Sequence, residues 1–319
     1  MRLYDYVIFH KGCFDGFSSY VILNNTGMVA DDAIIYPDMP SAKSTPPNID
    51  GKNIIIMDVA YKYDIAKEIF NRAKYVTFID HHITIHDDVS RLEKEISNPN
   101  ITIIYDESEC GASLTWKYFH KNKKMPLFID YVKDNDIGAW KLQHTHSFMA
   151  SLETKFRTIP NKENLAKWDL LYDNHVIHKL IDKGDIYREY IDHLLHVNSK
   201  KYSLEYFPSE KVYNDYSDFF KKPLEYKVAV FCGNGCPNTS QLGLRMCQTI
   251  ECDFAIMWTL HMDRKEYVLA FRSMNTDVGK IAQIFGGGGH TLASACSFPI
   301  SKYRIEDLFH TESLPRQSK

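Results

Sequence analysis

Four short apolar segments alternate with helical patterns in the first 120 residues of the chain. They are residues 3–10, 53–58, 75–79 and 101–105. Between them, residues 63–74 place Ile65, Ala66, Ile69 and Phe70 on one face of a helix. Strands that alternate with helices form a parallel sheet covered by helices on both faces. The sequence therefore predicts an α/β fold.

The pattern changes in the second half of the chain. Residues 145–200 lack strand patterns and are predicted to be helical, and residues 201–223 are mixed and polar, as a connector would be. Strand and helix patterns then resume from residue 226. We therefore predict a first domain over residues 1–195, a linker over 196–224 and a smaller α/β domain over 225–319.

The bulk composition limits the class of protein. The net charge of −3 argues against a protein that binds long nucleic acids through a surplus of positive charge. Seven cysteines without a disulfide pattern indicate a reducing, cytoplasmic location. A zinc site is the weaker reading of their loose spacing. No signal peptide and no membrane-spanning run is recognisable.

Acidic residues and histidines follow several of the predicted strands. They are His10 with Asp15, then Asp58, then Asp80-His81-His82, and further on Asp134 and Asp136. Ligands gather at the carboxyl ends of parallel strands, and carboxylates placed together there need a shared cation. Each residue alone could be a helix cap or a half-buried histidine, but the combination predicts a site for divalent metal ions, a pair of which can promote phosphoryl displacement.

Four segments of the chain resemble the motifs of the DHH phosphoesterase superfamily. They are HKGCFDGF at residues 10–17, IMD at 56–58, FIDHH at 78–82 and KDND at 133–136. Residues 110–116 are similar to the helix after the third motif. Residues 271–273 and 285–295, which contain Gly-Gly-Gly-Gly-His, resemble the DHH-associated domain of the nanoRNase branch. The resemblance implies a DHH catalytic domain followed by a substrate-binding domain.

The resemblance also implies roles for individual residues. The metal ligands would be His10, Asp15, Asp58, His81 and Asp136, which would hold two Mn²⁺ ions, with Mg²⁺ or Co²⁺ as alternatives. Asp58 would bridge the ions, and a metal-activated water would attack phosphorus. Asp80 would orient the histidine pair, and His82 would face the scissile phosphate. Asp134 remains the alternative to Asp136 as a ligand.

Cys13 departs from the pattern of the family, in which many relatives carry an aspartate at this position. Thiolate is a poor ligand for Mn²⁺. Either the first metal site manages without this ligand or it is weaker here. An ordinary packed thiol is the simplest interpretation of Cys13.

The glycine run that precedes His290 could form an anion-binding nest or a flexible turn. By resemblance, the residues that bind the nucleotide would be Arg272, Ser273, Gly288, Gly289 and His290.

The sequence thus predicts a hydrolase of phosphate esters in small nucleotides or short oligonucleotides. The alternatives are a cyclic-dinucleotide phosphodiesterase, a single-strand exonuclease, a polyphosphate or pyrophosphate hydrolase, and a non-catalytic nucleotide-binding module. The sequence predicts no membrane partner and leaves the oligomeric state open.

Overall fold

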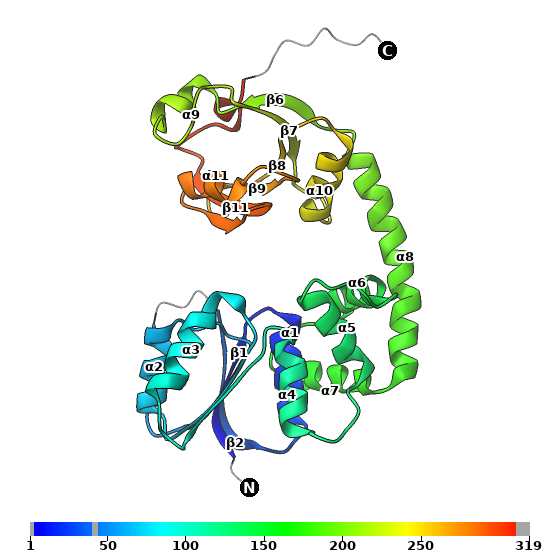
Figure 1. Ribbon diagram of the computed structural model, residues 1–319. Coiled ribbons are helices and arrows are strands. Elements are labelled where there is room, and N and C mark those ends of the chain that lie inside the picture. The colour runs from blue at the N-terminus through cyan, green and yellow to red at the C-terminus, as the bar shows by residue number, and fades with distance from the viewer. Residues whose placement is uncertain (1–2, 40–43, 311–319) are drawn as a thin grey trace. The chain divides into compact units, whose positions relative to one another are not determined.

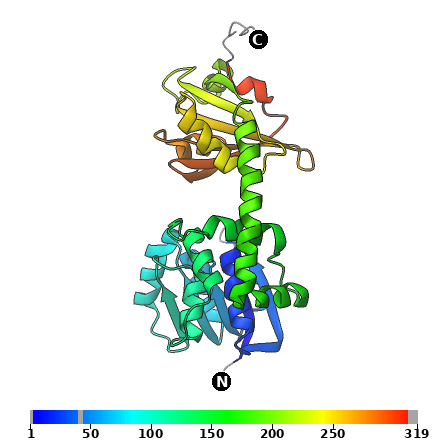
Figure 2. The ribbon, with the colours of Figure 1, turned by 90° about the vertical axis from the view of Figure 1, so that its right-hand side faces the viewer.

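Two units make up the chain: unit 1, Met1–Arg188, and unit 2, Glu189–Lys319. The computed structural model describes residues 3–39 and 44–310. The division falls inside a helix, α8 (Asn174–Asn198), which Figure 2 shows as one continuous element. Each unit has its own sheet and its own hydrophobic core.

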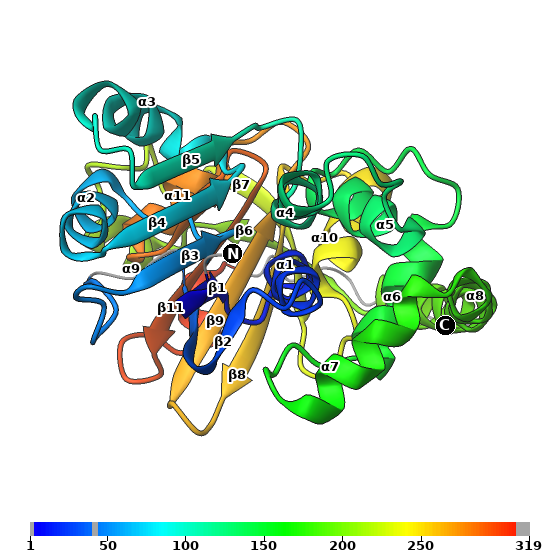
Figure 3. The ribbon, with the colours of Figure 1, turned by 90° about the horizontal axis from the view of Figure 1, so that it is seen from below.

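The sheet of unit 1 (Figure 1) consists of five parallel strands in the order β2-β1-β3-β4-β5, which can be followed in Figure 3. The strands are β1 (Tyr4–His10), β2 (Val29–Asp38), β3 (Asn53–Met57), β4 (Tyr75–Asp80) and β5 (Ile101–Tyr105). The predicted α/β fold with a parallel sheet is therefore confirmed. β2 was not predicted, because this edge strand is only partly buried and carries the exposed pair Asp31 and Asp32.

Helices cover both faces of this sheet (Figure 3). They are α1 (Phe14–Asn24), α2 (Tyr63–Arg72), α3 (His86–Glu95) and α4 (Gly111–Phe119). Successive residues of β1 point to opposite faces. Val7 and Phe9 pack in the core with residues of α1 and α4, while Tyr6 and Ile8 pack in a second core with residues of α2 and α3.

The chain reverses its direction of travel across the sheet between β1 and β3. From β1 the chain passes to β2 on one side, and from β3 it passes through β4 to β5 on the other. In open parallel sheets, ligands bind at the carboxyl ends of the strands where this reversal occurs. The ends of β1 and β3 carry His10 and Asp58.

A group of helices completes unit 1. They are α5 (Leu127–Asp136), α6 (Thr145–Lys155) and α7 (Lys162–Asp169), followed by α8. The buried ring of Trp168 lies 5.1 Å from that of Phe17 and so joins α7 to α1. The predicted helical character of residues 145–200 is confirmed. Among the described residues, no helix is both long enough and apolar enough to span a membrane.

Unit 2 contains a mixed sheet in the order β10-β11-β9-β8-β7-β6, in which only the pair β7 and β8 is parallel. Its strands are β6 (Ser203–Phe207), β7 (Tyr226–Cys232), β8 (Phe254–His261), β9 (Glu266–Arg272), β10 (Gly288–His290) and β11 (Ala293–Pro299). Its helices are α9 (Glu210–Asp215), α10 (Thr239–Thr249) and α11 (Val278–Ile284).

Residues 196–224, which were predicted as a linker, belong to unit 2. They contain α9 and β6, which pairs with β7 through its whole length. Phe207 of β6 is fully buried against Phe254 and Phe220. The polar composition that suggested a linker belongs to an edge strand and its following loop, where one side faces water.

Candidate metal centre

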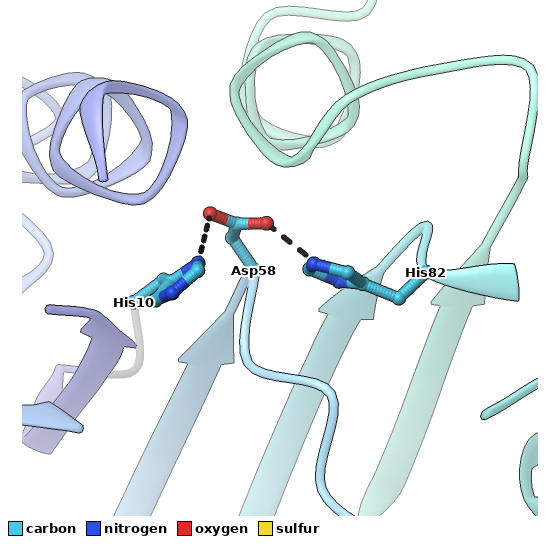
Figure 4. Close-up of side chains that lie close together, drawn as sticks. All are labelled: His10, Asp58 and His82. Atoms are coloured by element: carbon cyan, nitrogen blue, oxygen red, sulfur yellow. Dashed lines mark ion pairs between the residues drawn. The ribbon is translucent and has the colours of Figure 1, made fainter. Parts of the chain in front are cut away.

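His10, Asp58 and His81 lie at the carboxyl ends of the adjacent strands β1, β3 and β4. In Figure 4 the carboxylate of Asp58 lies between the imidazoles of His10 and His82. Its Oδ2 is 3.3 Å from His10 Nδ1, and its Oδ1 is 3.8 Å from His82 Nδ1 and 3.2 Å from His81 Nε2. The parallel sheet therefore brings together residues that are up to 72 positions apart in the sequence.

The backbone of Asp58 has a left-handed conformation, with φ of 62°. Aspartate tolerates this region better than most residues, although it still costs free energy. The amide of Asp58 donates a hydrogen bond to Ile79 O at 3.0 Å, which fixes the turn after β3 to the neighbouring strand. The fold thus holds a buried carboxylate in a strained position at the centre of the site.

Three buried polar atoms in and around this cluster have no hydrogen-bond partner among the described residues. One is Asp80 Oδ2. The other two are His10 Nδ1 and Asp58 Oδ2, which face each other at 3.3 Å without forming a hydrogen bond. Leaving such atoms unpaired is costly. Ligand atoms bound to one ion at about 2.1 Å lie about 3 Å apart when they are at right angles. This pair therefore fits a cation better than it fits a hydrogen bond.

A second group of atoms surrounds His81. Its Nε2 lies 3.2 Å from Asp58 Oδ1, 3.6 Å from Asp15 Oδ2 and 3.3 Å from Asp136 Oδ2. Two sets of three side chains have ligand atoms close enough to hold an ion: His10, Asp58 and His82, and Asp15, Asp58 and His81. Asp58 belongs to both sets, so one carboxylate connects two candidate ion positions.

Asp15 is positioned by the amino end of α4. Its two carboxylate oxygens accept hydrogen bonds from the backbone amides of Gly111 and Ala112, at 2.5 and 2.8 Å. The helix dipole favours a negative charge at this end. A Cβ atom on Gly111 would lie 2.7 Å from Asp58 Cβ and 2.9 Å from Asp15 Oδ2. Only glycine therefore lets the helix approach both carboxylates so closely.

Asp80 contacts both histidines through one carboxylate oxygen. Its Oδ1 accepts hydrogen bonds from the backbone amides of His81 and His82 at 2.7 and 2.8 Å, and lies 2.9 Å from His82 Nδ1. An ionised carboxylate only accepts hydrogen bonds, so the proton of this contact belongs to Nδ1 of His82. Nε2 is left as the nitrogen of His82 that can exchange a proton.

The carboxylates of the cluster disturb one another's ionisation. Burial and the charge of Asp58 raise the pKa values of Asp15 and Asp136. Burial also disfavours the charged form of Asp58, but the imidazoles of His10 and His81 outweigh it and lower its pKa to about 2. The cluster is therefore one in which protons or metal ions must share the negative charge.

The same charges act on the histidines. Burial disfavours the imidazolium form of His81, yet the hydrogen bond to Asp58 and the charge of Asp15 raise its pKa to about 9. The pKa of His82 is also raised, because Asp80 outweighs the effect of burial. A cation that takes the place of these protons would release them into solution.

The structure separates Asp134 from Asp136. Asp134 points away from the cluster and accepts hydrogen bonds from the amides of Lys141 and Leu142 at 2.8 and 3.1 Å, and from the hydroxyl of Thr145. Asp136 is the acid whose carboxylate reaches His81. The geometry thus favours Asp136 over Asp134 as the ligand.

Cys13 caps the amino end of α1, where its sulfur accepts a hydrogen bond from the amide of Asp15 at 3.3 Å. Burial, with the charges of Asp58 and Asp15, raises the pKa of this thiol, which keeps it neutral. Cys13 also lines a cavity of about 190 Å³ together with Asp15 and Asp136. Its position thus agrees with a neutral, packed thiol beside the ion positions.

Glu109 was not predicted as a site residue. Its carboxylate lies 2.7 Å from Lys117 Nζ and 2.7 Å from Lys133 Nζ, and it accepts a hydrogen bond from Ser113 Oγ at 2.7 Å. Lys117 and Ser113 belong to α4, which holds Asp15, and Lys133 belongs to α5, which carries Asp136. Only the tertiary structure reveals this link, because the lysines are 8 and 24 positions away along the chain.

In unit 2, Arg272 and Ser273 have structural partners. The guanidinium of Arg272 donates to Ser240 Oγ at 3.0 and 3.1 Å and to the carbonyl of Phe271 at 2.6 Å. The side chain of Ser273 is buried, and its hydroxyl accepts a hydrogen bond from the amide of Thr276 at 2.7 Å. This hydrogen bond caps the turn that follows Ser273.

The glycine run is an edge strand rather than an open loop. Gly288, Gly289 and His290 form β10 and pair with residues 293–295 of β11. A Cβ atom on Gly287 would lie 2.2 Å from the carbonyl oxygen of Ala295. Glycine is required at this position because the two backbones approach each other so closely. His290 is exposed.

Comparisons with known proteins give the following similarities. An uncharacterized protein of Acanthamoeba polyphaga mimivirus is 29% identical over 309 residues, which are 92% of this chain and 67% of that protein. The solved structure of the pGpG-specific phosphodiesterase PggH from Vibrio cholerae has a TM-score of 0.49 at 14% identity, covering 93% of this chain and 94% of that chain. An exopolyphosphatase-related protein from Bacteroides fragilis has a TM-score of 0.38 at 15% identity, covering 92% and 86%. No family model matches.

Proposed function

We propose that this chain is a divalent-metal-dependent phosphoesterase that hydrolyses phosphate ester bonds of small nucleotides or short oligonucleotides. The observation that carries the proposal is the position of Asp58. It is a buried, strained carboxylate that lies within 3.3 Å of two imidazoles from neighbouring strands. The motif resemblance described above supports the same class of reaction.

The residues proposed to hold two Mn²⁺ ions are His10, Asp15, Asp58, His81 and Asp136. Imidazole and carboxylate ligands together suit first-row divalent ions. Bound ions supply charge stabilisation for the phosphoryl group and lower the pKa of a bound water. Three carboxylates whose pKa values depend on one another, beside two unpaired buried atoms, are the chemical reason to expect cations here.

His82 is proposed to act on the phosphate group. Asp80 fixes its orientation and holds the proton on Nδ1, so Nε2 can donate a proton or a hydrogen bond. The raised pKa of His82 increases the fraction that carries this second proton near neutral pH. Asp80 is therefore proposed as the residue that orients His82 and His81.

Unit 2 is proposed to bind the nucleotide through Arg272, Ser273, Gly288, Gly289 and His290. The exposed imidazole of His290 and the backbone amides on the free edge of β10 are donors that phosphate oxygens accept. The net charge of −3 supports a small substrate over a long polyanion.

A hydrolysis panel with Mn²⁺ tests this function. It should contain dinucleotides, longer RNA and DNA, cyclic dinucleotides, bisphosphorylated adenosine, pyrophosphate and polyphosphate. Asp58→Asn serves as the blank, because asparagine tolerates the left-handed backbone that alanine would strain. Asp64→Asn, at an exposed carboxylate of α2, is the matched control.

The expected result is Mn²⁺-dependent turnover of dinucleotides or bisphosphorylated adenosine by the wild type and by Asp64→Asn, and no measurable turnover by Asp58→Asn. Hydrolysis of pyrophosphate or polyphosphate with intact nucleotides would contradict the proposed substrate. Equal turnover by Asp58→Asn would contradict the proposed metal centre.

A further inference from the structure

Trp140 is a large aromatic side chain that the core of unit 1 does not use. It keeps 58% of its surface exposed, whereas Trp168 is fully buried and Trp116 is 8% exposed. Burying an aromatic ring is one of the larger favourable contributions to folding. Packing within unit 1 therefore does not explain why tryptophan occupies this position.

The backbone of Trp140 is held in a strained conformation. Its φ of 45° lies in the left-handed region, which is an outlier for a bulky residue and costs about 1–3 kcal/mol. The amides of Ala139 and Trp140 both donate to the carbonyl oxygen of Asp134, at 3.0 and 3.2 Å. The carboxylate of Asp134 binds the next two amides, those of Lys141 and Leu142.

Asp134 thus fixes a rigid loop that presents the indole to solvent. The ring of His146 lies 5.7 Å from that of Trp140 at an interplanar angle of 36°, which supports the indole from within unit 1. Strained residues that the surrounding structure holds in place tend to occur at ligand-binding sites. A rigid, exposed aromatic face is suited to stack on a flat ligand.

The loop also connects directly to the candidate metal centre. Asp136, whose Oδ2 is 3.3 Å from His81 Nε2, ends α5 and precedes Trp140 by four residues. Four residues span at most about 14 Å, and the hydrogen bonds to Asp134 O return the loop to the last turn of α5. The loop that carries the indole therefore lies at the same end of α5 as Asp136, the carboxylate that faces His81.

We propose that Trp140 stacks on a nucleobase of the substrate and makes the site select nucleotides over base-free phosphates. This inference rests on the proposed function. Stacking of a base on an aromatic side chain contributes about 1–3 kcal/mol and tolerates any base, because every base has a flat π-face. The selection is therefore for the presence of a base and not for its identity.

The test compares Trp140→Ala and Trp140→Phe on two substrates: a 5′-phosphorylated dinucleotide and the same compound with abasic sugars. The quantity measured is the ratio of kcat/KM for the dinucleotide to that for the abasic compound. We expect Trp140→Ala to lower this ratio about 5- to 150-fold, mainly through KM for the dinucleotide. Trp140→Phe should retain most of it, because phenylalanine also stacks.

Ile159→Ala is the matched control, since Ile159 is an apolar residue of unit 1 with the same 58% exposure. It should leave the ratio as in the wild type. An equal loss on both substrates, or a lower melting temperature of Trp140→Ala without a change in the ratio, would overturn the proposal.

A binding measurement separates this inference from the proposed function. If the wild type hydrolyses neither substrate, the proposed function fails, and the dinucleotide is then titrated while tryptophan fluorescence is followed. Quenching in the wild type that is lost in Trp140→Phe supports stacking. Equal quenching in both proteins overturns it.

Discussion

Replacing Glu109 by glutamine tests whether this buried carboxylate joins α4 to α5. Its neighbours explain its ionisation: burial disfavours the charge, but Lys117, Lys133 and Ser113 outweigh burial and lower the pKa of Glu109 from 4.5 to about 2. A pKa lowered to this extent corresponds to at most about 3.4 kcal/mol of folding free energy. Lys117 is half exposed, so screening by water reduces the expected value to about 1–2 kcal/mol.

The assay is urea unfolding of the wild type and Glu109→Gln between pH 7 and pH 2. The folded pKa of Glu109 lies below the unfolded one, so its stabilisation is present above about pH 4.5 and is lost as the pH falls toward 2. The difference in unfolding free energy should be about 1–2 kcal/mol at pH 7 and should shrink below pH 4.5. Glu93→Gln, at an exposed position of α3, is the control. A difference that stays constant down to pH 2 would refute the reasoning.

Three further predictions concern the metal centre. Asp134→Asn should lower the free energy of unfolding by about 1–3 kcal/mol, because it weakens the acceptor of two amides and the Thr145 hydroxyl. Asp136→Asn should weaken Mn²⁺ binding in calorimetric titrations without this loss of stability. The opposite pattern would mean that Asp134 is the ligand and Asp136 the structural residue. Gly111→Ala should also weaken Mn²⁺ binding, since its methyl group would lie 2.7 Å from Asp58 Cβ, and an unchanged affinity would show that α4 can shift freely. Mn²⁺ at 100 times its Kd should raise the free energy of unfolding of the wild type by about 2.7 kcal/mol, and a chelator should abolish this gain. A similar gain in Asp58→Asn would show that the ion binds elsewhere.

Much of the fold of unit 1 follows from local sequence patterns. The apolar runs that became β1, β3 and β4 are buried on both faces, which produces continuous hydrophobic segments that are easy to find. β5 is only partly buried, but three of its five residues are isoleucine, so its apolar run is also easy to find. β2 and β6 could not be found in this way, because each is an edge strand whose apolar residues are interrupted by acidic ones: Asp31 and Asp32 in β2, and Glu205 in β6. The pairing of β6 with β7 depends on contacts that no local pattern records.

The residues at the strand ends were predicted from strand order and resemblance, and the structure brings His10, Asp58 and His81 together. Their roles as ligands stay predictions. The choice between Asp134 and Asp136 depends on how α5 ends and which carboxylate the following loop uses. Glu109 was missed for a related reason, since its two lysines come close only when α4 and α5 pack.

The position of Asp58 in both groups of candidate ligands would have a thermodynamic consequence. Two ions that share one carboxylate cannot bind independently, because the first ion neutralises part of the charge that attracts the second while it also fixes the orientation of the shared group. Occupancy of one position therefore changes the affinity of the other, and linkage requires the effect to be equal in both directions. The centre would thus respond to metal concentration as a coupled pair, with a population of singly loaded protein set by the sign of that coupling.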